Sequence, residues 1–194
     1  MVKIRAFLQR KDIIFSGKRY GIDALSAMAE GLFCTLLVGT ILDTLGKQLG
    51  IGFLQAILVT IGKGEGAVSY TIGGLASVMV GPGIAVAIGY ALHAPNLVLF
   101  SLIPVGFAAN AMGGAGGPLS VYFVAVVASE FGKLVSKETK IDLLVTPIVT
   151  ILVGIGFAYL VAAPIGAGAY AVGQAVMWAT ELQPFFMGML VSVL

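Results

Sequence analysis

The chain has 194 residues, of which 59% are hydrophobic and 10% charged, and its formal net charge is +2. A soluble domain averages about 25% charged residues, so these proportions exclude a soluble fold that covers its own surface with polar groups. The mean hydropathy of +1.05 and the recurring apolar runs of about 20 residues predict an all-α, polytopic transmembrane helical bundle.

Basic residues gather at the N-terminus, where six of the eleven precede position 20. An apolar run follows them at once, so the cluster indicates membrane topology rather than nucleic-acid binding. It predicts a multi-pass protein of the cell (plasma) membrane with a cytoplasmic N-terminus. We divide the chain into a basic cytoplasmic segment, 1–20, expected to form an interfacial helix, and a transmembrane domain, 21–194.

The transmembrane domain contains about six apolar runs that are long enough to cross a bilayer. In chain order they are expected at 22–42, 67–92, 97–112, 119–135, 143–163 and 169–194. Glycine and proline interrupt or separate some of them, at 81–83, 113–118 and 164–168. Since the sequence stops inside an apolar run, we expect it to be the N-terminal part of a longer protein.

One apolar run, 51–62, is too short to cross. Twelve residues reach about 18 Å as a helix, against a hydrocarbon core of about 30 Å, so we expect a re-entrant or broken segment near 51–66. If this run does not cross, Lys133, Lys137 and Lys140 lie on the side of the N-terminus, as the positive-inside tendency favours.

The sequence shows no catalytic constellation of a soluble enzyme. It has one histidine and one cysteine, and neither a Walker motif nor a His-Glu-x-x-His motif. We therefore expect no catalytic residue, no metal site and no cofactor. At most, the chain is the membrane subunit of a multicomponent enzyme.

The candidate substrate-binding residues are polar groups expected at membrane depth. Lys63, Gly64, Glu65 and Gly66 belong to an Ile-Gly-Lys-Gly-Glu-Gly stretch after the half-length run. If unwound there, this stretch exposes backbone groups beside an acid and a base. The alternative is an ordinary extracellular turn.

Four further candidates come from other segments. Gln55 and Tyr70 flank that stretch and could hydrogen-bond to, or stack on, a sugar-like solute. Glu30 lies within the first span, where isolated acids usually face the protein interior. Asn110 either binds a polar solute or caps its helix. By contrast, Glu130 is interpreted as a surface partner of Lys133, three residues later.

Three stretches, at 18–33, 110–118 and 182–190, resemble the phosphotransferase-system EIIC-like proteins, including the perfringolysin O regulator-like group. Their sequences are KRYGIDALSAMAEGLF, NAMGGAGGP and LQPFFMGML. The resemblance implies a homodimeric channel subunit in the lipid bilayer, which moves a sugar inward while a IIB-type phosphocarrier partner phosphorylates it.

Two departures from that family limit what the resemblance implies. The Gly-Ile-Thr-Glu-Pro-type motif of glucose-superfamily EIIC proteins is missing, and no IIA or IIB domain is present. Three functions therefore stay open. They are an EIIC-type transport subunit for a small polar solute, first of all a sugar; a membrane sensor or regulator without transport; and an ion- or proton-coupled transporter with Glu30 and Glu65 as relay carboxylates.

Overall fold

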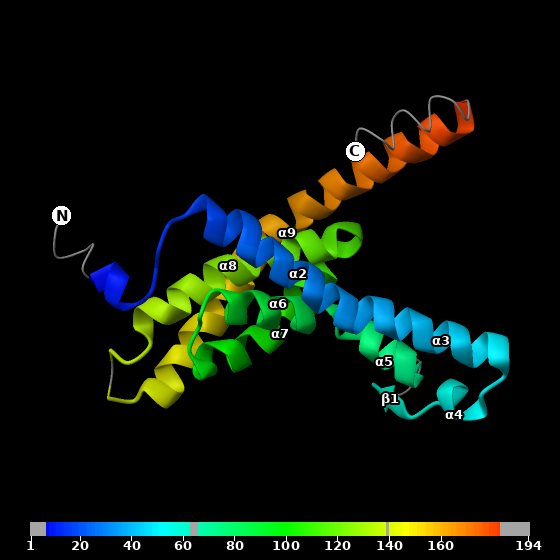
Figure 1. The fold of residues 1–194 in the computed structure, drawn as a ribbon, viewed down its shortest axis with the longest axis horizontal. Coiled ribbons are helices and arrows are strands. Elements are labelled where there is room, and N and C mark those ends of the chain that lie inside the picture. Colours follow the sequence, from blue (N-terminus) through cyan, green and yellow to red (C-terminus); the bar gives the residue numbers. More distant parts are fainter. Residues whose placement is uncertain (1–6, 63–65, 139, 183–194) are drawn as a thin grey trace.

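The computed structural model describes residues 7–62, 66–138 and 140–182, with the backbone alone at 179–182, and this part is mostly helical (Figure 1). Its elements in chain order are η1 (Arg19–Asp23), α2 (Ala24–Leu32), η2 (Phe33–Leu37), α3 (Val38–Leu49), α4 (Gly52–Gln55), β1 (Val59–Ile61), β2 (Val68–Tyr70), α5 (Ile72–Val78), α6 (Val80–Ala91), α7 (Asn96–Gly113), η4 (Gly114–Gly116), α8 (Gly117–Val135) and α9 (Asp142–Leu182).

Within the described residues, three helical runs are long and apolar enough to cross a membrane: Arg19–Leu49, Asn96–Val135 and Asp142–Trp178. The pair α5–α6, bent by 53°, makes a fourth candidate. The mostly helical architecture with long apolar helices agrees with the sequence, although β1 and β2 add a two-stranded sheet. Judged by helix length and apolar composition, the described residues contain three or four candidate crossings, fewer than the expected six or so.

The first long helix joins η1, α2, η2 and α3 without a break and contains two π-helical turns, η1 and η2. Glycines bring it close to two neighbours. A Cβ atom on Gly31 would lie 2.7 Å from the carbonyl oxygen of Gly83 in α6, and one on Gly39 would lie 2.6 Å from that of Gly73 in α5. Small residues thus allow close backbone approach, as is usual between membrane helices.

Residues 51–62 do not form one regular helix, as their length predicted. They contain the four-residue α4 and then β1, which pairs antiparallel with β2 in the register Val59↔Tyr70 and Ile61↔Val68. Several apolar side chains of α4 and of the stretch before β1, such as Phe53 and Ile57, are exposed. A re-entrant course through the membrane stays a prediction.

The core of the bundle lies where α6, α7 and α8 pack together, around the fully buried Ile84, Leu102 and Val121. Helices α7 and α8 are antiparallel, because Gly132 near the end of α8 lies against Val98 at the start of α7. The chain reverses at Gly114, whose φ of +50° suits glycine. The helix break expected in the glycine-rich stretch 113–118 is therefore confirmed.

Two of the expected helix breaks do not occur where the sequence predicts them. The bend between α5 and α6 falls at Met79 rather than at 81–83, because Pro82 fits into the first turn of α6, where its missing N–H costs little. The expected break at 164–168 does not occur, since α9 runs through Pro164 as one helix. Gly166 instead lets α9 approach the 113–116 turn, where a Cβ would lie 2.5 Å from the carbonyl oxygen of Gly113.

The N-terminal segment crosses one end of the bundle. Residues 7–10 are helical and 13–16 have no regular secondary structure, Ile13 is buried, and the Lys11 ammonium donates to the carbonyl oxygen of Ser136. The N-terminal segment and the 136–141 loop therefore lie at the same end, as the charge distribution predicted. Which side of the membrane they face stays a prediction, as does the interfacial helix.

Candidate functional site

Glu30 lines a groove of about 750 Å³ between α2, α6 and α7. It follows Arg19 by eleven residues, which places it about 16 Å further along the helix. That distance is about half the thickness of a bilayer core. Ser26 and Thr35 add hydroxyl groups to the same groove, and Gly83 and Tyr90 line its α6 side. Glu30 makes no ion pair with any described residue.

The wall of this groove is shaped by the contact between Gly31 and Gly83. A side chain at either position would push the helices apart. The Thr35 hydroxyl donates to the carbonyl oxygen of Gly31 at 2.7 Å, and the π-turn η2 begins two residues after the contact, at Phe33. Single π-turns inside α-helices occur frequently at functional sites. The groove thus combines two carboxylates, those of Glu30 and Asp23, with two hydroxyls and an irregular helix.

The residues expected around Glu65 lie only partly within the structure. Lys63, Gly64 and Glu65 are outside the described residues. Gly66 follows them and is exposed, and Gly62 has a φ of +104°, which favours glycine. The expectation that this stretch binds a solute therefore stays a prediction.

Gln55 and Tyr70 belong to the hairpin segment that carries the same stretch. The Gln55 amide donates to the carbonyl oxygen of Gly46 in α3, so it ties α4 to the first helix. Tyr70 pairs with Val59 in the two-stranded sheet and is half-buried. Both residues flank the Glu65 stretch, as expected, and neither lines the groove beside Glu30.

Asn110 lies apart from both places, in the last turns of α7. Its side chain lies against Gly81 of α6 and Gly117 of α8, where added Cβ atoms would clash with it. It therefore fills the junction of three helices. The structure distributes the candidate residues over three places: the groove, the hairpin and this junction.

A buried polar cluster at the end of the bundle was not predicted. Lys133 is fully buried, with 2% of its side chain exposed, and donates to Glu130 at 2.9 Å and to the carbonyl oxygens of Leu92 at 3.0 Å and Asp12 at 3.1 Å. The interpretation of Glu130 and Lys133 as a surface pair was wrong. An ammonium group has three donors, and all three are used here.

Asp12 connects this cluster to the first helix. Its carboxylate accepts two hydrogen bonds from Arg19, at 3.0 and 2.5 Å, and lies 3.0 Å from Nδ1 of His93. The hydrogen bonds from Arg19 outweigh desolvation and lower the pKa of Asp12 from 3.8 to about 2. Arg19 also donates to the carbonyl oxygen of Leu92 at 2.6 Å. The pair therefore closes the cluster around Lys133.

A family profile described as phosphotransferase system, EIIC, matches residues 22–194. The match covers the first long helix almost from its start, both walls of the groove, the hairpin and all of α9. The chain belongs to the phosphotransferase-system EIIC family. This EIIC chain is thus a membrane-embedded transport subunit that works with other components of the phosphotransferase system. No curated protein and no solved structure matches it.

The match begins at Ile22, so Asp12 and Arg19 precede the matched region, whereas Lys133 lies within it. The cluster therefore joins the segment before the EIIC match to the EIIC bundle. In the sequence, the only indication of this cluster is the spacing of Glu130 and Lys133. Nothing in the sequence indicates that the two side chains are buried. In the parts of the EIIC chain that are described, no group of three or more His, Cys, Asp or Glu side chains could hold a metal ion.

Proposed function

We propose that this EIIC chain binds a small polar solute, most consistently a sugar, in the groove beside Glu30 and moves it across the membrane. The observation that supports this function is a carboxylate in the middle of an apolar helix, lining a groove and lacking an ion-pair partner among the described residues. A lipid-facing acid at this depth costs about 2.5–3.5 kcal/mol. Contact with a polar solute pathway removes that cost.

The groove has the size and chemistry that a sugar requires. Its volume of about 750 Å³ lies within the usual range of ligand pockets, about 300–1,000 Å³. Sugar hydroxyls donate hydrogen bonds, and the Glu30 carboxylate accepts them. Ser26 and Thr35 supply further hydrogen-bonding groups, while Tyr90 offers an aromatic ring. A ring with several hydroxyl groups fits this combination better than a small inorganic ion does.

A second set of solute contacts is proposed at the hairpin, where Lys63, Gly64, Glu65 and Gly66 follow β1. The glycines would let the backbone approach a ligand, and Lys63 could pair with Glu65 until a hydroxylated solute arrives. Gln55 and Tyr70 flank this stretch. Since the hairpin and the groove have different lining residues, we propose that they serve different stages of one transport path.

Binding can be measured with a panel of hexoses, hexitols and disaccharides, scored by the thermal stabilisation of the protein in nanodiscs. For the sugar that stabilises most, Glu30→Gln and Glu65→Gln should each weaken binding tenfold or more, which is about 1.4 kcal/mol. Thr40→Val is the control, since this exposed hydroxyl on the same helix bonds only to backbone and is not part of the groove. Unchanged affinity in Glu30→Gln, with the variant folded, would remove the groove from the proposal.

Uptake into proteoliposomes separates transport from the two alternatives. Accumulation that needs a IIB-type phosphocarrier and a phosphoryl donor supports the EIIC mechanism. Accumulation driven by a pH gradient alone would instead favour proton coupling, for which an unpaired Glu30 is suited. Sugar binding without any uptake would favour a sensor or regulator of the same fold.

The proposed topology places the N-terminus and the 136–141 loop in the cytoplasm, with α5–α6, α7 and α8 as separate passes in the plasma membrane and the protein as a homodimer. The position of six basic residues before residue 20 supports this orientation. Impermeant thiol reagents on intact cells provide the test, in a Cys34→Ser background. A cysteine at position 47 should react and one at position 137 should not, and the reverse result would invert the topology.

A further inference from the structure

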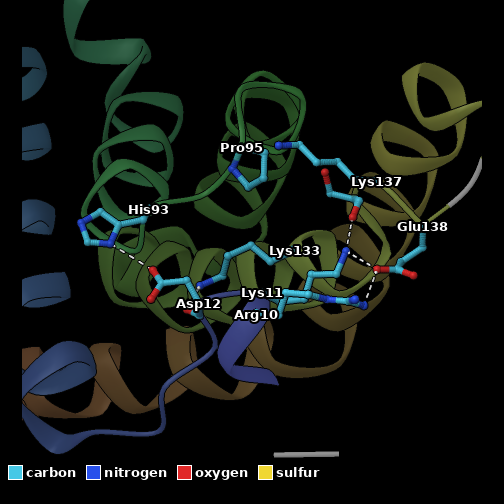
Figure 2. Close-up of a pocket in the computed structure, with 9 residues that line it drawn as sticks. Arg10, Lys11, Asp12, His93, Pro95, Lys133, Lys137 and Glu138 are labelled. Atoms are coloured by element: carbon cyan, nitrogen blue, oxygen red, sulfur yellow. Dashed lines mark hydrogen bonds and ion pairs between the residues drawn. The ribbon is translucent and has the colours of Figure 1, made fainter. Parts of the chain in front are cut away.

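A separate pocket of about 460 Å³ lies at the end of the bundle where the N-terminal segment crosses it (Figure 2). Three segments that are distant in sequence line it: the N-terminal segment at 10–12, the turn at 93–95, and the end of α8 with its following loop, 133–138. The pocket shares no lining residue with the groove beside Glu30. It therefore needs its own explanation.

The pocket is electropositive, because four cations line it against two carboxylates. Both carboxylates are engaged, Asp12 by Arg19 and Glu138 by Lys11 at 2.6 Å. Two of the four cations are less fully engaged. Arg10 reaches Glu138 only at 3.5 Å with 69% of its side chain exposed, and the Lys137 ammonium makes no ion pair with any described residue. Positive charge remains available to a ligand.

Ser136 contributes a second, independent observation. It lines the pocket and only 3% of it is exposed, yet its hydroxyl has no hydrogen-bonding partner among the residues described. A buried polar group without a partner costs about 1–3 kcal/mol. One explanation for such a group in a native structure is a bound water or ion. A ligand that accepts a hydrogen bond inside this pocket would satisfy it.

The backbone of the pocket is held in an unusual conformation. In the described chain, the non-glycine residues with positive φ are Asp12, His93 and Lys137, at 54°, 56° and 63°. Each comes from a different one of the three segments that line the pocket. Such conformations cluster at ligand-binding sites, where surrounding contacts fix them. Here the Asp142 carboxylate accepts from the Lys137 amide at 2.8 Å, so the loop is shaped before a ligand arrives.

We propose that this pocket binds a phosphate group, with Arg10 and Lys137 as its cationic partners and the Ser136 hydroxyl as a hydrogen-bond donor. A phosphate has several acceptor oxygens in a tetrahedral arrangement, so it can use donors that converge from three segments. Arginine and lysine are the side chains that most commonly bind it. The phosphate belongs either to a free phosphate or phosphomonoester, or to the headgroup of an anionic lipid. The proposal is independent of the solute groove.

The test uses the purified protein in nanodiscs of phosphatidylcholine, titrated with inorganic phosphate against chloride at equal ionic strength, with calorimetry as the readout. Arg10→Gln, Lys137→Gln and Ser136→Ala should each weaken phosphate binding, the two charge changes by tenfold or more. Lys140→Gln is the matched control, because it removes the same charge three residues away from an exposed position outside the pocket. Its affinity should stay within twofold of the wild type.

A second arm compares thermal stability in nanodiscs of phosphatidylcholine with and without phosphatidic acid. Stabilisation by the lipid that is lost in Lys137→Gln but kept in Lys140→Gln identifies a headgroup site. Binding of inorganic phosphate with the same dependence identifies a site for free phosphate. If neither ligand binds, or if Lys140→Gln weakens binding as much as Lys137→Gln does, the proposal is overturned. Sugar-induced stabilisation should be unchanged in all four variants.

Discussion

Glu30 and Glu130 are both acids within apolar helices, but their surroundings differ. Glu130 is 12% exposed and accepts a hydrogen bond from the buried Lys133, which in turn bonds to two backbone carbonyl oxygens. Glu30 lines a groove and has no ion-pair partner among the described residues. The first acid belongs to a buried cluster of charged side chains, whereas the second lies in a groove that we propose as a solute site.

This contrast shows that an acid within a span is not by itself a functional site. A buried charge is tolerated when its partners are all present, and removing one partner leaves the other uncompensated. A charge that has no partner is kept for another reason, which is usually function. The two regions should therefore respond oppositely to substitution, with stability changing at the cluster and ligand binding changing at the groove.

The largest effect is expected for Lys133→Met, which removes the central cation of the cluster. Glu130 would be left buried without its partner, the carbonyl oxygen of Asp12 would lose its donor, and that of Leu92 would keep only its bond from Arg19. We expect the free energy of unfolding to fall by about 3–5 kcal/mol, measured by denaturation in mixed micelles. Lys140→Met, at an exposed site, should change it by less than about 0.5 kcal/mol. Equal losses in the two variants would contradict the structural role of the cluster.

The double variant Glu130→Gln/Lys133→Met gives a sharper form of the same test. Because it removes both charges, it should recover a substantial part of the stability that Lys133→Met loses. If the double variant were as unstable as the sum of the two single variants, the pair would not be coupled.

At the groove, the backbone contact rather than the charge should determine stability. Gly31→Ala places a Cβ 2.7 Å from the carbonyl oxygen of Gly83, so α2 and α6 must separate. We expect a loss of about 1–3 kcal/mol. Gly156→Ala in α9 is the control, since its Cβ would meet no atom within 4 Å, and it should be neutral or slightly stabilising. A neutral Gly31→Ala would show that the helices do not approach so closely.

Acid should release the N-terminal segment only at low pH. Since the folded state lowers the pKa of Asp12 from 3.8 to about 2, its contribution to stability is present above pH 3.8 and is lost as the pH falls through 2. The wild type should exceed Asp12→Asn in stability by about 1 kcal/mol above pH 4, after a discount for solvent screening. This difference should shrink between pH 4 and pH 2. A difference that does not depend on pH would exclude the ionised carboxylate as its source.

The smallest change in stability is expected for Glu30→Gln. Because Glu30 has no ion-pair partner to lose within the described part of the chain, the free energy of unfolding should stay within about 0.5 kcal/mol of the wild type, although sugar binding falls. Glu130→Gln should lower it more, since it removes the negative charge that pairs with the buried Lys133. A Glu30→Gln variant as unstable as Glu130→Gln would remove the distinction between the two acids.

Local features of the fold were largely predictable from the sequence. Helix α7 was expected at 97–112 and runs Asn96–Gly113, and α8 was expected at 119–135 and runs Gly117–Val135. In both cases apolar length and a glycine-rich break determine the ends. The unbroken α9 was not predictable, because one of the glycines that suggested a break at 164–168, Gly166, serves a contact with a turn some fifty residues earlier in the chain.

The site was less predictable than the fold for a related reason. The length of the 51–62 run and the isolation of Glu30 are local features, and both can be recognised from the sequence alone. The cluster depends on contacts such as those of Lys133 with Asp12 and Leu92, which join residues 121 and 41 positions apart. No periodic pattern records such pairings. The burial of Lys133 follows from them and was therefore missed.

The π-turn η2 determines where the first helix can change in length. Gly31 and Gly39 both contact the α5–α6 pair, yet eight residues of α-helix, at about 100° each, would place them about 80° apart around the axis. A π-turn accommodates one extra residue, which reduces the offset to about 20°. Deleting one residue within Phe33–Leu37 should therefore convert the turn to regular α-helix and keep both glycines in phase. A deletion elsewhere between Ala24 and Leu49 would rotate one part of the helix away from its neighbour, so a one-residue deletion should be tolerated only at this turn.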